Sequence, residues 1–238
     1  LLLSFGLIFS LSIAVSAQSS KENSTTDQQQ DSTSNEDLGK RQDLFFIDLN
    51  WDYLFGMPST VNQKYWGRGV SLGLMFDQPL NETNNISLAI GAGFQTHNYY
   101  TDGVVRNYDT TSVTESVWLN PDASEKVKGK ISLNYVDVPF EVRFRTNPNE
   151  KGFRWKFAVG GKVGYLIQAH EKTINDQDIK VKYYNYPTIN TIRYGVTARV
   201  GYGSVMLSSF YSLSNMFNQN HLNDNPTAFS VGISLVPF

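Results

Sequence analysis

Apolar residues recur at every second position in several segments of the chain, and the positions between them are polar or small. Alternation with a period of two is typical of a β-strand whose two faces meet different surroundings. The pattern predicts eight strands, over residues 45–55, 70–77, 86–95, 136–145, 153–168, 192–202, 205–213 and 229–235. None of the apolar faces carries a charged residue, whereas acids and bases collect on the opposite faces.

Aromatic residues lie near both ends of the apolar band: Phe76, Phe144, Trp155 and Tyr202 at one end, and Tyr53, Tyr165, Tyr194 and Tyr211 at the other. Amphipathic rings favour the headgroup level of a membrane, so this arrangement predicts two aromatic girdles. A soluble sandwich with an apolar core is the alternative. A sandwich would not place Arg, Lys and Asp on nearly every opposite face.

The connections between the predicted strands alternate in length along the chain. Residues 56–66, 98–130, 169–188 and 215–226 form long connections, and 77–85, 146–152 and 202–204 form short ones rich in Asn, Pro and Gly. Membrane barrels combine short periplasmic turns with longer extracellular loops. The sequence therefore predicts an all-β fold, an eight-stranded antiparallel up-and-down transmembrane β-barrel in the outer membrane of a Gram-negative bacterium.

The N-terminal region has a different composition. Residues 1–15 form an apolar run, and Val15 and Ala17 fit the positions that precede a signal-peptidase cut, so residues 1–17 are predicted to be a signal peptide for secretion across the inner membrane. Residues 18–42 hold almost nothing apolar, which predicts a disordered periplasmic linker, and a partner-binding role for it stays open. Residues 43–238 would form the barrel.

Composition excludes several kinds of chemistry. The chain has no cysteine, which rules out disulfides, thiolate metal sites and a cysteine nucleophile. A net charge of −2 argues against nucleic acid as a partner. No metal-binding or cofactor motif is present in the sequence, so no cofactor is predicted.

Three segments resemble the outer-membrane β-barrel domain family of small porin-like and PorT-like barrels. They are NYVDVPFEVRFRT at 134–146, FYSLSNMF at 210–217, and the last strand, ending in Phe238. The resemblance spans residues 43–238. It implies an eight-stranded barrel whose final strand is recognised through Phe238 by the barrel-assembly machinery.

Two places depart from the alternation. Val236 and Phe238 are out of phase with residues 229–235, which predicts a bulge near Val236. Residues 131–135 place Ile131, Leu133 and Tyr135 out of phase with the apolar face that begins at Val136, which predicts a change of register in that strand. Pro139 should face inward.

The bore of an eight-stranded barrel is wide enough only for the side chains that fill it. Its predicted acids lie on different strands from most of its bases, so opposite charges should meet across the bore. The predicted network consists of Asp48, Asp52, Asp77, Asp137, Glu141, Arg143, Lys162, Arg193 and Arg199, with Arg145, Arg154 and Lys156 as further inward bases. Pairing would make a polar plug; a narrow conduction path through it is the alternative.

Three functions remain open. The first is a non-enzymatic scaffold or recognition platform, whose long loops offer Tyr99, Tyr100, Tyr108, Trp118, Tyr183, Tyr184 and Tyr186 to an extracellular ligand or protein partner. Those aromatics would serve equally well as cross-strand packing if the strands extend beyond the membrane. The second is a narrow channel or an accessory barrel in transport or secretion. The third is a hydrolase of the outer rim, using His97, His170 or His221; no nucleophile motif supports it, and we expect no enzyme.

Overall fold

A computed structural model describes residues 42–109, 114–119, 128–174, 179–184, 188–218 and 225–236. The strands are β1 (Gln42–Phe55), β2 (Gly67–Pro79), β3 (Ile86–Thr101), β4 (Val104–Asp109), β5 (Thr114–Leu119), β6 (Lys128–Arg145), β7 (Trp155–Ile174), β8 (Lys180–Tyr183), β9 (Ile192–Tyr202), β10 (Val205–Asn215) and β11 (Thr227–Leu235). None of the described residues forms a helix long and apolar enough to cross a bilayer.

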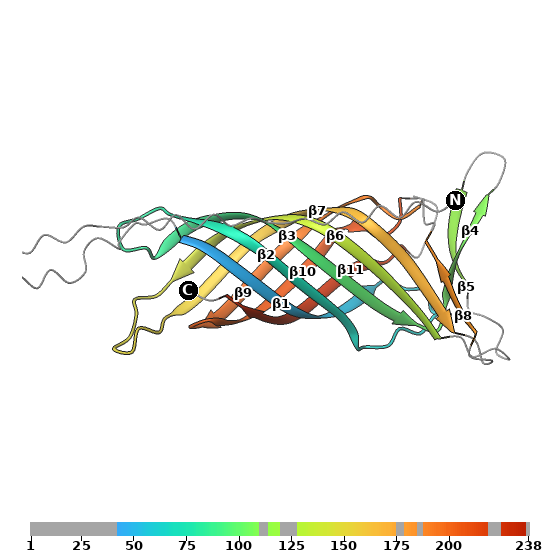
Figure 1. Cartoon of the computed structure of the whole chain (residues 1–238), viewed down its shortest axis with the longest axis horizontal. Coiled ribbons are helices and arrows are strands. Elements are labelled where there is room, and N and C mark those ends of the chain that lie inside the picture. Colours follow the sequence, from blue (N-terminus) through green and yellow to red (C-terminus); the bar gives the residue numbers. More distant parts are fainter. Residues whose placement is uncertain are drawn as a thin grey trace, which may run out of the picture. The chain divides into compact units, whose positions relative to one another are not determined.

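Eight of these strands form a closed antiparallel barrel (Figure 1). The order in the sheet is β6-β3-β2-β1-β11-β10-β9-β7, and pairing of β6 with β7 closes it. The first and last strands of the chain are neighbours, from Ile47 opposite Leu235 to Phe55 opposite Thr227. Closure leaves no strand edge unpaired, as a sheet in hydrocarbon requires. The predicted eight-stranded barrel is confirmed.

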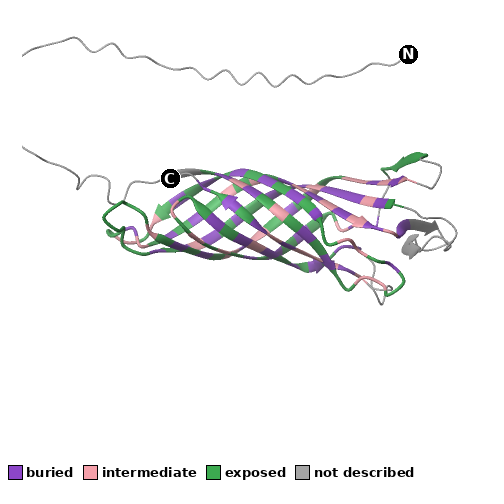
Figure 2. Ribbon diagram, turned by 90° about the horizontal axis from the view of Figure 1, so that it is seen from below, coloured by how far each residue is buried: buried purple, intermediate pink, exposed green. Residues whose placement is uncertain are grey.

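The apolar faces point outward and the charged faces point into the bore. Buried and exposed residues alternate along the strands, which Figure 2 shows as purple and green bands on the ribbons of the barrel. In β2, Leu72 and Leu74 are about half exposed, whereas Ser71 and Asp77 are buried. The side chains of both predicted aromatic girdles are also exposed: Phe76, Phe144, Trp155 and Tyr202, and Tyr53, Tyr165, Tyr194 and Tyr211.

The two ends of the barrel differ. The short turns join β2 to β3, β6 to β7 and β9 to β10 at one end, here called the short-turn end; the other is the long-loop end. At the long-loop end, β3, β6 and β7 continue well past the predicted strand ends, to Thr101, from Lys128 and to Ile174. The predicted long connections 98–130 and 169–188 are therefore partly strand. They also carry β8, which pairs with the end of β7, and the β4–β5 hairpin.

The change of register predicted for residues 131–135 is found in the pairing of β6 with β7, but the faces of β6 itself do not change phase there. β6 keeps one register with β3 along its length, and Ile131, Leu133 and Tyr135 lie on the same bore-facing side as Asp137. All three are buried, because the bore at this level is filled by apolar side chains rather than by charges. The irregularity lies on the neighbouring strand, where the pairing of β7 shifts opposite Asn134 and Tyr135.

The predicted bulge near Val236 is wrong. From Phe229 to Leu235, β11 keeps one register with β1 and with β10, and Val236 follows on the bore-facing side. It is buried there in an apolar cluster with Phe46, Met75, Ala89 and Met206. Val236 is therefore in phase with the bore-facing residues of β11, because apolar side chains line part of the bore near the short-turn end. Phe238, the predicted signal peptide and residues 18–41 of the predicted linker lie outside the described residues.

The outward orientation of the apolar face has a direct test. Leu72→Arg places a charge in the middle of β2 on the exposed apolar face, and we expect it to lower the free energy of unfolding from a bilayer by about 2–4 kcal/mol. Leu80→Arg is the matched control, because Leu80 is exposed in the turn after β2; it should cost about 1 kcal/mol or less. Reversible unfolding in urea, followed by tryptophan fluorescence in lipid vesicles, measures both. Equal costs would show that the face does not contact hydrocarbon.

Candidate functional site

Near the short-turn end, the bore holds a cluster around Asp77 of β2. Arg145 of β6 donates to one carboxylate oxygen of Asp77, and the Ser87 hydroxyl donates to the other at 2.7 Å. Arg145 also donates to Ser87 at 2.8 Å. Arg143 lies between two carboxylates, 3.6 Å from Asp77 and 3.1 Å from Glu141.

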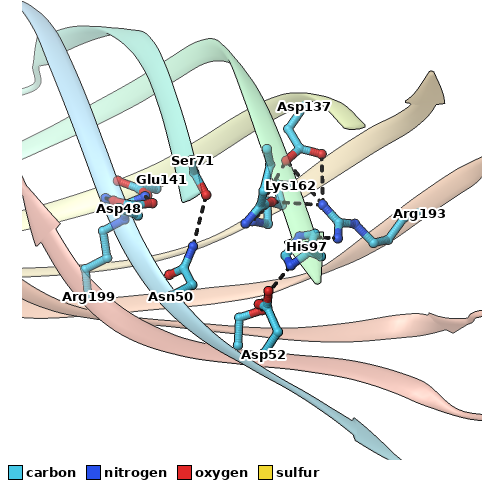
Figure 3. A network of polar contacts seen from close by, with 12 residues as sticks. Asp48, Asn50, Asp52, Ser71, His97, Asp137, Glu141, Lys162, Arg193 and Arg199 are labelled. Atoms are coloured by element: carbon cyan, nitrogen blue, oxygen red, sulfur yellow. Dashed lines mark hydrogen bonds and ion pairs between the residues drawn. The ribbon is translucent and has the colours of Figure 1, made fainter. Parts of the chain in front are cut away.

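In the middle of the bore, Arg199 of β9 joins strands on opposite sides of the barrel (Figure 3). Its two terminal nitrogens donate to both carboxylate oxygens of Asp48 on β1, at 3.1 and 3.0 Å. Its Nε lies 3.0 Å from Glu141 Oε1 on β6, and it donates to the Ser234 hydroxyl of β11 at 2.6 Å. A bidentate arginine–carboxylate pair is strong and directional, so this contact sets the distance between β1 and β9.

Towards the long-loop end, a chain of polar contacts runs from Asp52 to Asp137 (Figure 3). His97 Nδ1 lies 2.8 Å from Asp52 Oδ1, and His97 Nε2 lies 2.7 Å from Arg193 Nη1. A guanidinium can only donate, so Nε2 accepts and the ring proton is on Nδ1, donated to Asp52. Arg193 continues to Asp137 at 3.2 Å and to Gln95 at 2.9 Å.

Lys162 and two aromatic rings complete this upper group. Lys162 donates to Gln95 Oε1 at 2.6 Å and lies 4.0 Å from Asp137. The Arg193 guanidinium lies 3.8 Å from the centre of the Tyr135 ring, and Lys162 lies 4.1 Å from that of Phe210. Cations packed against ring faces are stabilised where water is excluded.

The structure places all nine residues of the predicted network in the bore and joins them into these contacts. Lys156 is buried and Arg154 half-buried at the short-turn end. Sequence reasoning missed His97 and Gln95. His97 was expected at the base of a loop, whereas it lies on β3 with no exposed surface. The bore-facing alternation of β3 continues through Gln95, His97 and Tyr99, which was the available signal.

Two apolar clusters share the bore with the charged groups. The cluster at the long-loop end consists of Leu54, Val61, Tyr99, Val105, Ile131, Leu133, Tyr135, Ile189, Met216 and Phe217. Tyr99 stacks on His97, with ring centres 6.0 Å apart, so this cluster lies directly on the polar chain. The smaller cluster around Phe46 and Val236 lies towards the short-turn end, beside the charged group around Asp77.

The polar chain does not have the geometry of a nucleophilic triad. The Ser230 hydroxyl donates to Asp52 Oδ1 at 2.7 Å, so the carboxylate lies between the serine and the histidine. Both nitrogens of His97 are occupied, by Asp52 and Arg193, and neither is available to accept a proton from a hydroxyl. Among the described residues, no group of three His, Asp or Glu side chains could hold a metal ion.

A comparison with known protein families agrees with a barrel whose apolar faces point outward and whose charged side chains fill the bore. Residues 46–218 match the family described as outer membrane protein beta-barrel domain. The chain belongs to this family. Membership places it in the outer membrane, with its apolar faces against lipid. In membrane barrels the longer loops are extracellular, so we expect the long-loop end on that side. No curated protein matches the chain in sequence.

Solved structures show more distant likeness. The attachment invasion locus protein Ail of Yersinia pestis is 10% identical, with a TM-score of 0.35, over 83% of this chain and 97% of its own. Two mutants of the Rh. blastica porin are 10% and 11% identical, with TM-scores of 0.22 and 0.21, over 83% of this chain and 100% of theirs. Likeness at this level carries no argument about this family member.

If charge pairing stabilises the bore, the effect of Asp48→Asn on the free energy of unfolding should change sign when its partner Arg199 is removed. Arg199→Met leaves the Asp48 carboxylate buried without its bidentate partner, and we expect it to lower the free energy of unfolding by about 3–5 kcal/mol. Asp48→Asn should destabilise the wild-type chain, because it weakens that pair. In the Arg199→Met background the same change should stabilise, because it removes an uncompensated charge. Urea titration in vesicles measures all four proteins; additive losses would contradict the pairing.

Proposed function

We propose that this outer-membrane barrel is non-enzymatic and does not conduct, and that it serves as a rigid scaffold that displays its extracellular strands and loops to a ligand or protein partner. The observation that carries the proposal is the filling of the bore. Paired charges occupy its middle and its short-turn end, and a large apolar cluster covers them at the long-loop end.

A conduction path would have to displace side chains from this filling. Arg193 and Asp137 are buried, only 8% of the Arg199 side chain is exposed, and all three are bonded to partners on other strands. Freeing any of them leaves a charge without a partner in a low-dielectric interior, which costs several kcal/mol. An ion passing along the axis would also have to cross the apolar cluster around Tyr99, where the described residues offer no line of charges.

The extracellular end of the barrel has an exposed surface that a ligand or protein partner could contact. β3, β6 and β7 extend the barrel wall outward, and β8 widens the sheet at the edge of β7. Aromatic side chains are strongly exposed at this end, with Tyr65 at 79% and Tyr184 at 59%. Exposed rings on a rigid support favour recognition of a ligand or partner.

Catalysis at the outer rim has little support in the described residues. His97 is enclosed in the bore. His170 lies opposite Ser132 in the β6–β7 register, but its Nδ1 has no hydrogen-bond partner among the described residues, and its ring packs beside Tyr184 at 5.7 Å. His221 lies outside the described residues. The C-terminal segment that contains β11 and Phe238 is proposed as the part of the chain that the barrel-assembly machinery recognises.

Planar-bilayer recording tests the closed bore. We expect the purified, folded chain to produce no stable single-channel steps, because no continuous polar path crosses the apolar clusters. A general-diffusion porin inserted in the same bilayer is the positive control for insertion and sensitivity. Reproducible steps from the wild-type chain would overturn the closed bore and support the narrow channel.

Enzymatic activity has a separate test. The folded protein, incubated with phospholipid vesicles or with an unfolded protein substrate, should release neither fatty acid nor peptide above a heat-unfolded sample. Release that disappears in His170→Ala would contradict the non-enzymatic proposal and support the rim hydrolase.

A further inference from the structure

Lysine side chains stand side by side on the outer surface of the extracellular sheet. In the register of β6, β7 and β8, Lys130 lies opposite Lys172, and Lys172 lies opposite Lys182. One step further out, Lys128 and Lys180 lie on either side of Ile174. These five lysines, Lys128, Lys130, Lys172, Lys180 and Lys182, are called the lysine face.

The irregularity in β7 creates this face. Tyr165 points outward below it, Ile167 and Gln168 are both exposed, and beyond them the alternation has changed phase. Glu171 is consequently buried inside the barrel, and Lys172 lies on the outer side. Without the extra residue, Glu171 would stand between the lysines of the neighbouring strands. The bulge therefore removes the one acid that β7 could have placed there.

Like charges directly opposite one another across strands are destabilising. Burial, followed by the ammonium groups of Lys172 and Lys182, lowers the pKa of Lys130. Burial and the charges of Lys130 and Lys182 likewise lower the pKa of His170, which lies beside the lysine face. No ion pair joins any of the five lysines to another residue within the described ranges.

The ring of His170 provides a second observation. Its Nδ1 is shielded from solvent and has no hydrogen-bond partner among the described residues. The ring packs beside Tyr184, which is strongly exposed. The same surface thus presents several positive charges and an unsatisfied polar atom.

The position of the lysine face limits what can reach it. Lys130 and Lys128 lie on the same side of β6 as Val136 and Val138, which face the lipid. Lys130 is six residues beyond Val136, which pairs with Tyr165 of the aromatic girdle nearer the long-loop end. At ~3.3 Å per residue and a strand tilt of about 40°, Lys130 stands roughly 15 Å above that girdle. A ligand here stands beside the barrel wall, above the headgroup level that the girdle marks and at the height of the sugars of a glycolipid.

We propose that the lysine face binds the phosphate groups of anionic glycolipid in the outer leaflet, beside the barrel. The rows of lysine have no acidic partner, and phosphate would supply that negative charge. A glycolipid in the outer leaflet presents its phosphate from the side that these lysines face. A soluble polyanion or an acidic protein would approach more readily from the tips of the loops. The proposal does not depend on whether the bore conducts.

Binding of purified lipopolysaccharide to the full chain in neutral detergent micelles tests this, with affinity measured by native mass spectrometry. The variant K130Q/K172Q/K182Q should bind about 100-fold more weakly than the wild type, at about fivefold for each lysine removed near an anionic headgroup. K130R/K172R/K182R keeps the charge and should bind as the wild type does. K151Q, at an exposed lysine of the short-turn end, is the unrelated control.

Stability provides a readout that keeps the test decisive if binding is hard to resolve. The glutamine variant should fold, and unfold at the same temperature as the wild type or higher without glycolipid, because it removes like-charge repulsion. Added lipopolysaccharide should raise the unfolding temperature of the wild type and of the arginine variant only.

Three results would overturn the proposal. The first is equal binding by the glutamine variant and the wild type. The second is equal binding of enzymatically dephosphorylated lipopolysaccharide, which would show that the sugars or acyl chains are recognised. The third is tighter binding of inorganic phosphate or of a heparin fragment than of lipopolysaccharide, which would point to a soluble anion as the ligand.

Discussion

The rest of this structure depends on the pairing of every backbone amide and carbonyl inside hydrocarbon. Water is absent there, so a sheet can span the membrane only if its first and last strands meet. The β1–β11 and β6–β7 ladders provide this closure, and they fix the barrel at eight strands. With the number of strands set, the bore has room for side chains alone.

The narrow bore determines how its charges behave. Arginine and aspartate residues that face inward are removed from both water and lipid, so each must find a partner across the barrel. Arg199 and Arg193 do this by reaching from β9 to Asp48 on β1 and to Asp137 on β6. Such contacts tie distant strands together, and the apolar cluster at the long-loop end shields them from water on that side. A filled, cross-linked barrel suits a rigid support better than a passage.

Beyond the membrane the same wall serves a different purpose. β6 and β7 continue outward, and a single irregularity in β7 decides which of their charges are displayed and which are buried. Lys172 lies outside and Glu171 inside because of that extra residue. One bulge thus separates the lipid-facing surface of the barrel from the charged surface above it, and links the fold to the proposed binding of phosphate.

The sequence alone determined the strand pattern, the outward apolar face and the set of inward charges, because side-chain alternation and aromatic position are local properties that a period of two reveals. It did not determine which face Val236 or Ile131 occupies. An apolar residue at a position where the alternation predicts a polar one can mean either that the strand bulges or that the bore is apolar at that level. Only the tertiary structure decided that, along with which acid meets which base and the place of His97. Those outcomes depend on which strands face one another across the closed barrel, a relation that no short stretch of sequence contains.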